Sequence, residues 1–428
     1  MAISEAPPEP DDSALPEPGQ AEPTRTSLIR IALLAAVVAV VGVQGGLPWL
    51  FIIGSIVAMI FLHELGHFLT AKHAGMKVTQ FFLGFGPRIW SIRRGETEYG
   101  IKAIPAGAYV KVVGMYNLDE VDAADEQRTY RQKTYRQRVV MAAAGSTMHF
   151  LLALVLIYGV LVGVGRPKLD NWEVRAVSPG SSAEVAGLQP GDRLITINRS
   201  GVADWNDMRD VILPLQGQTV PIVFERNGVT ASVEVTIGAN PVRPQEGQLG
   251  VGPSFPPERV GPIAAVGQTV REFGDVAAAS VKGMVQLFTP AGLGSFAQQV
   301  AQGRPEPSTD AAGSSSGGGG ENRFLSIYGA ARLGVDLTRE GIAPALGFLA
   351  MLNIFIGMFN LIPLLPFDGG HIAIATYERV RELLRRDGRR YFTDVGRLLP
   401  LTYAVVALLV MIGLSSFYLD FVNPVHLP

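Results

Sequence analysis

Apolar residues form long blocks along the chain, separated by stretches rich in charge. No charged residue lies between Ile31 and Leu62, a block longer than the roughly 20 residues that one membrane span needs. The segment 45–48, Gly-Gly-Leu-Pro, interrupts it, so we expect apolar helices at 27–44 and 48–70 joined by a tight turn. Further apolar blocks predict spans at 139–164, 343–363 and 400–418.

The first apolar block, 27–44, has two readings: an additional membrane span or the core of a signal peptide. Residues 1–24 are rich in Pro, Glu and Asp without Lys or Arg, and no clear small-x-small cleavage site follows the block. Both features favour a span. The predicted fold class is therefore a membrane α-helical bundle with four core spans and an additional N-terminal span, preceded by a disordered tail at 1–26.

The remaining segments predict β structure and a linker. Residues 76–116 alternate and are rich in Gly, β-branched and aromatic residues, which predicts a membrane-associated β-hairpin region. Residues 170–240 predict a soluble β-rich domain. Residues 241–342 predict a linker with amphipathic helices, and its Ser/Gly-rich part, 303–322, is expected to be disordered.

Basic residues set the expected orientation. Lys and Arg are dense in 71–138 and 377–397, and such loops stay on the cytoplasmic side. One span then separates residue 138 from the soluble domain, which places 166–340 outside the cell. The sequence thus predicts a multi-pass protein of the inner (plasma) membrane with a cytoplasmic N-terminus.

Composition narrows the chemistry. Hydrophobic residues make up 48% of the chain and charged residues only 17%, which fits a membrane protein with a soluble part. No basic stripe with interleaved aromatic residues supports nucleic-acid binding. The chain has no Cys, which excludes disulfides, thiolate metal sites and a cysteine nucleophile. Any zinc must be held by His, Asp or Glu.

The segment His63-Glu64-Leu65-Gly66-His67 ends the apolar helix predicted at 48–70. Two His residues four positions apart lie on one face of a helix and can hold Zn²⁺, while the Glu between them can act as a general base toward water. An ionisable group in an apolar span costs about 2.5–3.5 kcal/mol even on a lenient scale. The position therefore favours a catalytic zinc site over a surface coincidence.

A catalytic zinc needs a third protein ligand, and Asp368 is the candidate. It is the only acid between Glu340 and Glu378, and it lies at the cytoplasmic end of a predicted span, the same depth as His63 and His67. Prolines before it are expected to end the helix, and the Gly pair at 369–370 to form a tight turn. The alternative is a capping Asp at the membrane surface.

The two motifs together resemble the site-2 protease family of zinc intramembrane metalloproteases, most closely the bacterial regulator-of-sigma-factor proteases. The first is H-E-x-x-H at 63–67, and the second is N-x-x-P-x-x-P-x-D-G-G at 360–370. The resemblance covers most of residues 48–420. It implies that His63, His67 and Asp368 bind zinc, that Glu64 is the general base, and that Asn360 holds the substrate backbone.

One residue departs from the family pattern. Where the family has A-G-P-x-x-N, this chain has Ala-Gly-Ser-Thr-Met-His at 144–149, so His149 replaces the Asn. His149 is a candidate substrate-positioning residue, and the alternative is a hydrogen bond between helices. His371, beside the Gly pair, is expected to be structural or to support a metal ligand.

The soluble domain contains a segment, 177–198, that looks like part of a PDZ domain. By that resemblance it would bind an extended peptide or C-terminus, or it would act only as a steric filter. The leading hypothesis is a zinc-dependent intramembrane endopeptidase. Its expected substrates are single-span proteins, such as anti-sigma factors, already cut by another protease. The alternative is a membrane-anchored PDZ scaffold with a vestigial metal site.

Overall fold

The computed structural model describes residues 25–115, 121–167, 172–240, 243–302, 325–385 and 389–422. The predicted tail up to residue 24 and the predicted disordered stretch 303–322 lie outside the described residues. The chain divides into two compact units. One unit combines Met1–Leu156 with Glu272–Pro428, and the other is Ile157–Arg271. We call them the helical unit and the β unit.

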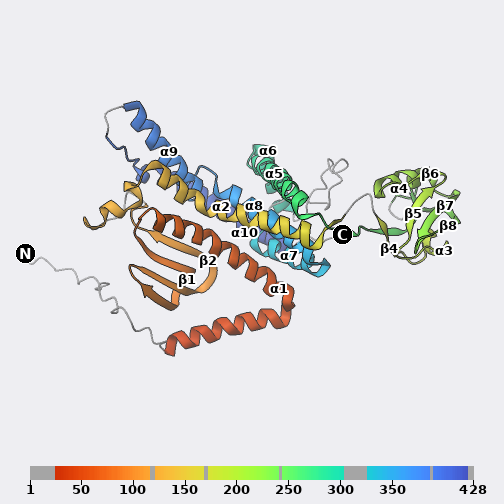
Figure 1. Ribbon diagram of the computed structural model, residues 1–428, viewed down its shortest axis with the longest axis horizontal. Helices are drawn as coiled ribbons and strands as arrows, with labels where there is room; N and C mark the ends of the chain where they lie inside the picture. The colour runs from red at the N-terminus through yellow and green to blue at the C-terminus, as the bar shows by residue number, and fades with distance from the viewer. Residues whose placement is uncertain are drawn as a thin grey trace, which may run out of the picture. The chain divides into compact units, whose positions relative to one another are not determined.

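Long helices dominate the first unit (Figure 1). Among the described residues, four helical segments are long and apolar enough to cross a membrane: Val38–His73, Tyr135–Val164, Ile342–Asn360 and Val395–Val422. They agree with the four predicted core spans, whereas the additional span at 27–44 stays a prediction. The longer helices of the described residues are α1 (Arg25–His73), α2 (Tyr135–Gly159), α5 (Pro262–Leu287), α6 (Pro290–Gln302), α7 (Ile327–Glu340), α8 (Ile342–Asn360), α9 (Asp368–Arg385) and α10 (Leu399–Val422), and two short ones, α3 (Ser182–Val185) and α4 (Trp205–Ile212), belong to the β unit.

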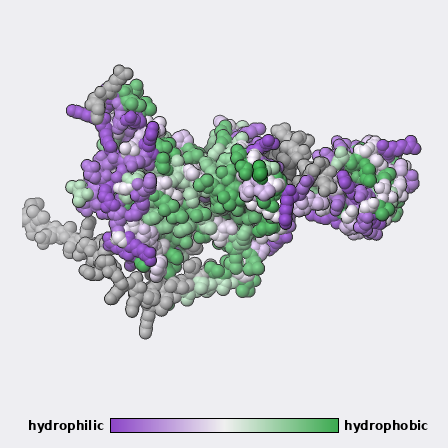
Figure 2. Space-filling view, in the orientation of Figure 1, coloured by the Kyte–Doolittle hydropathy of each residue, from purple (hydrophilic) through white to green (hydrophobic). Residues whose placement is uncertain are grey.

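The outer surface of these helices is apolar. In the helical unit, Figure 2 shows hydrophobic residues gathered over the helices and hydrophilic residues over the end that carries α9. Val155 of α2 is 66% exposed and Leu414 of α10 is 67% exposed. Large apolar side chains in contact with water would be unfavourable over so wide an area, so this surface fits contact with lipid.

A sharp bend divides α1, as the sequence predicts. Gly46 has φ 75° and ψ −175°, and Pro48 follows within the same helix. A positive φ suits glycine because it has no Cβ, and the proline cannot donate the backbone hydrogen bond of a continuous helix. The apolar block therefore forms two arms (Figure 1), and the second arm carries the His pair.

Glycines allow the helices around that second arm to approach closely. A Cβ at Gly66 of α1 would lie 2.8 Å from the carbonyl oxygen of Ala144 in α2. A Cβ at Gly357 of α8 would lie 2.5 Å from the ring of Phe150 in α2. Helix α2 is therefore packed tightly against both α1 and α8, the arrangement that small residues permit in membrane bundles.

The predicted β region at 76–116 forms one antiparallel hairpin. Strands β1 (Val78–Arg94) and β2 (Thr97–Val112) pair with Phe82 opposite Tyr109, and several register irregularities bend them. Helix α1 contacts both strands. The hairpin therefore lies beside the helix end that carries the His pair (Figure 1).

The β unit has a hydrophobic core of its own, built around Trp172, Leu194 and Ile222. Its four-stranded sheet has the order β6-β5-β7-β8, from β5 (Arg193–Ile197), β6 (Ser200–Gly201), β7 (Thr219–Arg226) and β8 (Val229–Thr236). Strand β4 (Glu173–Val177) pairs with β11 (Val251–Ser254). This pairing corrects the predicted boundary at 240, because the β domain takes a strand from the segment expected to be linker.

An ion pair between Asp192 and Arg226 stabilises the β unit. The side chain of Asp192 is fully buried, and Arg226 donates to it from Nε at 2.6 Å and from Nη2 at 2.7 Å. The backbone N–H of Gln189 donates to the same carboxylate at 2.8 Å. Burial alone would raise the pKa of Asp192, but these donors hold it below the ordinary value.

We expect the β unit to lose stability in acid through Asp192. A lowered folded-state pKa contributes stability above the ordinary value of 3.8, and that contribution is lost as the pH falls through the folded-state pKa. Amide protection of β5 and β7, corrected for intrinsic exchange, should therefore fall below about pH 4. Asp192→Asn should lower amide protection at pH 7 and make it depend less on pH below about pH 4. If amide protection of this variant falls in acid as steeply as in the wild type, groups other than Asp192 cause the pH dependence.

Candidate metal centre

Three side chains from two helices meet at the end of the second arm of α1. The Nε2 atoms of His63 and His67 lie 3.1 Å apart. Oδ2 of Asp368 lies 3.4 Å from Nε2 of His63 and 3.3 Å from Nε2 of His67. Ligand atoms from these three residues all lie within 4.8 Å of one another. The structure therefore brings together the three predicted ligands.

The outer ring nitrogen of His67 fixes how its imidazole faces. Nδ1 of His67 lies 2.8 Å from the carbonyl oxygen of Met141 in α2. A carbonyl can only accept, so Nδ1 carries the proton and a neutral ring presents its Nε2 lone pair inward. This arrangement, with the far nitrogen donating to a backbone carbonyl, is the usual support for a metal-binding His.

The triangle of ligand atoms fits zinc. Ligands about 2.0–2.1 Å from a tetrahedral Zn²⁺ lie about 3.3 Å apart, which matches the observed separations of 3.1–3.4 Å. Oδ2 of Asp368 is also buried without a hydrogen-bond donor. Lone pairs that converge without a donor are unfavourable unless a cation lies between them, and two His nitrogens with one carboxylate are the ligands expected for catalytic zinc.

Helix α2 forms the wall behind the ligands, and Gly145 is the residue that makes room. A Cβ at this position would lie 2.3 Å from Cε1 of His63 and 2.5 Å from Nε2 of His67. Both distances are far inside van der Waals contact. Sequence reasoning assigned this position no role of its own, because the need for a glycine follows from a contact between helices about 80 residues apart.

Glu64 lies between the two His residues on the side of the hairpin. It is partly exposed, and its carboxylate interacts with the backbone of Val110 in β2. The predicted base is therefore close to the metal ligands and accessible at the edge of the β-hairpin. A carboxylate in that position can take a proton from water held at the site.

Asp368 is placed by an unexpected element. The Gly pair at 369–370 was expected to form a tight turn, but both residues lie in the first turn of α9. A Cβ at Gly369 would lie 2.3 Å from the carbonyl oxygen of Leu361, and one at Gly370 would lie 2.6 Å from the backbone nitrogen of Leu365. The glycines therefore allow the loop after α8 to fold directly onto α9, and the prediction of a turn was wrong.

The two predicted substrate-positioning residues occupy different settings. Asn360 is the last residue of α8, at the start of the loop that leads to Asp368. His149 is buried in α2, with its ring centre 5.1 Å from that of His63. Its Nδ1 lies 2.8 Å from Oδ1 of Asn353 in α8, a bond between helices as in the alternative reading. Asn353, which the sequence analysis did not single out, is fully buried.

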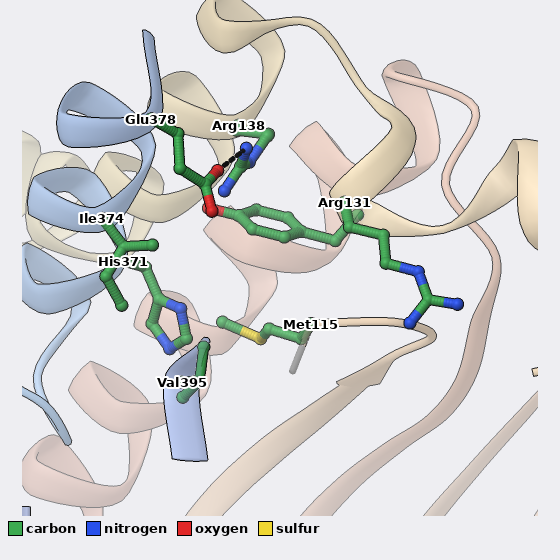
Figure 3. Close-up of a pocket in the computed structure, with 8 residues that line it drawn as sticks. Met115, Arg131, Arg138, His371, Ile374, Glu378 and Val395 are labelled. Atoms are coloured by element: carbon green, nitrogen blue, oxygen red, sulfur yellow. Dashed lines mark hydrogen bonds and ion pairs between the residues drawn. The ribbon is translucent and has the colours of Figure 1, made fainter. Parts of the chain in front are cut away.

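A buried ion pair joins α9 to α2 (Figure 3). Nη1 of Arg138 lies 2.6 Å from Oε2 of Glu378, with side chains 11% and 3% exposed. The Arg138 guanidinium lies over the ring of Tyr130, 4.9 Å from its centre, and the other Glu378 oxygen accepts the backbone N–H of Thr393 at 2.7 Å. Burial lowers the pKa of the nearby His371 to about 4, so this ring is neutral at neutral pH.

We expect Glu378→Ala to destabilise the helical unit by about 3–5 kcal/mol, because it leaves the Arg138 charge buried without a partner. Zinc retention should fall too, since Asp368 begins the same helix. Denaturant unfolding in mild detergent, with zinc content measured in parallel, tests both effects. The control is Glu382→Ala, which removes a more exposed partner of Arg379 and should cost less than about 1 kcal/mol. Equal losses in the two variants would contradict the prediction.

Comparisons with known proteins agree with this geometry. The model of peptidase family M50 matches residues 51–303 and 323–403. The chain is 34% identical over 412 residues to the zinc metalloprotease Rip1 of Mycolicibacterium smegmatis, covering 87% of this chain and 97% of that protein. It is also 34% identical over 410 residues to Rip1 of Mycobacterium tuberculosis, covering 87% and 96%.

More distant similarities are weaker. A putative zinc metalloprotease of Rhizobium meliloti is 29% identical over 346 residues, covering 76% of this chain and 84% of that protein. Among solved structures, the PDZ domain of an SdrC-like protein from Listeria monocytogenes is 18% identical, with a TM-score of 0.18, covering 20% of this chain and 90% of that one. A TM-score that low carries no argument about fold, so the PDZ-like character of the β unit stays a prediction.

Proposed function

The chain belongs to peptidase family M50 and is a zinc metalloendopeptidase of the membrane, and from this premise we propose that it cuts single-span membrane proteins within or at the edge of the bilayer. The observation that carries the proposal is the position of the site. His63 and His67 lie in a helix long and apolar enough to span the membrane, and Asp368 follows another such helix by eight residues. A peptide bond reaches these ligands only if the substrate enters the same layer.

Glu64 and the three ligands divide the chemical work. Zinc, when bound by His63, His67 and Asp368, polarises the scissile carbonyl and makes water a better nucleophile at neutral pH. Glu64 takes the proton from the attacking water and passes it to the leaving amine. The bond from His67 to the Met141 carbonyl keeps its lone pair aimed inward, so the ligand stays oriented during turnover.

The substrate helix has to unwind before it is cut, because a helix hides its peptide bonds within its own hydrogen bonds. Asn360, at the end of α8, is the residue proposed to hold the unwound backbone. Its amide offers both a donor and an acceptor. His149 is a second positioning candidate. The amide nitrogen of Asn353 donates to the Leu349 carbonyl, so the amide oxygen of Asn353 faces His149. Nδ1 of His149 must therefore be the donor in this bond, and its Nε2 is left to accept a hydrogen bond from substrate.

The proposed orientation places the catalytic end of the bundle at the cytoplasmic side of the plasma membrane and the β unit outside, because basic residues crowd the loops near the site. The proposed substrates are single-span proteins of the anti-sigma-factor type, already shortened outside by another protease. The β unit would bind an exposed peptide end or exclude bulky ectodomains.

The alternative of a scaffold with a vestigial metal site has lost its support. A vestigial site is expected to lack a ligand or the base, whereas His63, His67 and Asp368 converge and Glu64 lies beside them. The full-length similarity to zinc metalloproteases points the same way.

The decisive test compares membrane proteomes of cells that carry the wild-type chain or Glu64→Gln. We expect a single-span fragment, already cut on its outer side, to accumulate only with the variant. The fragment is then incubated with purified wild-type protein, which should cut it within its apolar segment. If no membrane fragment differs between the two strains, or if the cut lies in a soluble tail, the proposal of intramembrane proteolysis fails.

A further inference from the structure

Helix α9 has a buried face and an exposed face, and the metal centre accounts only for the buried one. One face, with His371, Ala375 and Glu378, is buried against the rest of the helical unit. The other carries large side chains that remain in the open. Their exposed fractions are 47% for Tyr377, 47% for Val380, 58% for Leu383 and 75% for Leu384. We call these four residues the outer face of α9.

Two arginines border the outer face and share one aromatic ring. The guanidinium carbons of Arg381 and Arg385 lie 5.1 and 5.0 Å from the centre of the Tyr391 ring. Arg381 also lies 5.8 Å from the Tyr377 ring. Stacking on an aromatic ring orders a guanidinium group, so both arginines are held at the Tyr391 ring.

No carboxylate of the described residues neutralises this arginine pair. The nearby acids are used elsewhere: Glu378 pairs with Arg138, Glu382 with Arg379 and Asp394 with Arg397. Nε of Arg381 is moreover buried without a hydrogen-bond acceptor. Two ordered guanidinium groups without an anion form a site for an oxyanion with several acceptor oxygens, such as a phosphate diester.

Both arginines lie a short distance beyond the end of a membrane span. Glu378 pairs with Arg138, which lies in the first turn of the span that begins at Tyr135. Arg381 and Arg385 lie three and seven residues further along α9, a rise of at most about 4.5 and 10 Å. The polar zone of one leaflet is about 5–8 Å deep, so Arg381 falls within it, and Arg385 does so when α9 is inclined toward the membrane plane. Tyr391 is likewise only four residues from the span that begins at Val395.

We propose that α9 and Tyr391 form a binding site for an anionic phospholipid of the adjoining leaflet. Arg381 and Arg385 bind the headgroup phosphate, and the outer face of α9 lies among the upper acyl chains. Exposed apolar side chains flanked by arginines, with a tyrosine at the interface, are the pattern of helices that lie in a membrane surface. Because it needs only the membrane spans, the proposal is independent of peptide hydrolysis.

Charge and position favour lipid over a second copy of this chain. A symmetric contact through the outer face would bring two arginine pairs toward each other, and like charges at short range are unfavourable. An anionic leaflet instead attracts juxtamembrane arginines by about 1 kcal/mol each. Two arginines therefore correspond to roughly a 30-fold preference for anionic over uncharged lipid at this site.

The first test measures lipid retention by the full-length protein in nanodiscs of phosphatidylcholine with increasing phosphatidylglycerol. Native mass spectrometry should show retained phosphatidylglycerol on the wild type, and Arg381→Gln/Arg385→Gln should need at least tenfold more of this lipid for equal retention. The matched control is Arg379→Gln/Arg397→Gln, which removes two arginines that already have carboxylate partners. Equal retention by all three proteins would overturn the proposal.

The second test uses the wild-type arginines and does not depend on how the double variant folds. The chain has no Cys, so Leu384→Cys and Val229→Cys each introduce a single site for a spin label. Oxygen should relax the label at 384 more than a water-soluble nickel chelate does, and the reverse should hold at 229, which lies in the β unit. A water-accessible label at 384 in anionic bilayers overturns the proposal, as does dipolar coupling between labels at 384, which indicates a second copy.

Discussion

A Glu64→Gln variant is expected to purify with the same zinc content as the wild type and to lose about 10²- to 10⁴-fold in the rate of peptide hydrolysis. Glu64 contributes no atom to the cluster of His63, His67 and Asp368, so the amide leaves the ligand set intact. It removes only the group that accepts a proton. Elemental analysis gives zinc per chain, and cleavage of a membrane-embedded peptide in proteoliposomes gives the rate.

Two variants bracket this result. His67→Ala should lose both zinc and hydrolysis, because the remaining two ligands bind a catalytic metal weakly. Glu340→Gln makes the same chemical change as Glu64→Gln at an exposed residue at the end of α7, and it should retain both properties. If Glu64→Gln cleaved at near the wild-type rate, Glu64 would not be the base. If it lost zinc, Glu64 would belong to the metal site instead.

The parts of the site that follow from local rules were predictable from the sequence. The i,i+4 spacing of His63 and His67 places both on one helix face, and the structure has them there. Asp368 followed from a second local fact, a lone acid at the end of an apolar block. The two segments could then be expected to meet, because spans of similar length that end on the same side of the membrane bring their ends to the same depth. The structure agrees, with separations of 3.3 and 3.4 Å from the two imidazoles.

The parts that depend on packing between distant segments were not predictable. The ion pair of Arg138 with Glu378 joins residues 240 positions apart, and nothing in either local sequence indicates the partner. The same holds for β11, which pairs with β4 across about 75 residues. The turn expected at 369–370 failed for a related reason. Glycine can signal a special φ or a close approach, and only the folded structure shows that the loop after α8 lies against these residues.

Gly145→Ala is expected to weaken zinc binding by at least about 10- to 100-fold, the range found when the support of metal ligands is disturbed. The added Cβ would lie 2.3 Å from Cε1 of His63 and 2.6 Å from its Nδ1. Movement of α2 away from α1 is opposed by its close packing against α8, where a Cβ at Gly357 would lie 2.5 Å from the Phe150 ring. The imidazoles must turn instead, and the match between the ligand triangle and tetrahedral zinc is lost.

The control for this substitution lies in the same helix. A Cβ at Gly159 has no heavy atom within 4 Å, so Gly159→Ala adds the same methyl group to α2 without a clash and should raise helix propensity slightly. Zinc titration of metal-stripped protein in detergent, followed by helical content, separates loss of the site from loss of the fold. Wild-type zinc affinity in Gly145→Ala would mean that α2 does not form the rigid back wall of the metal centre. If Gly145→Ala loses zinc affinity but keeps its full helical content, Gly145 is as necessary to the metal site as a ligand. The contact responsible joins two helices and could not be predicted from the spacing of residues in the sequence.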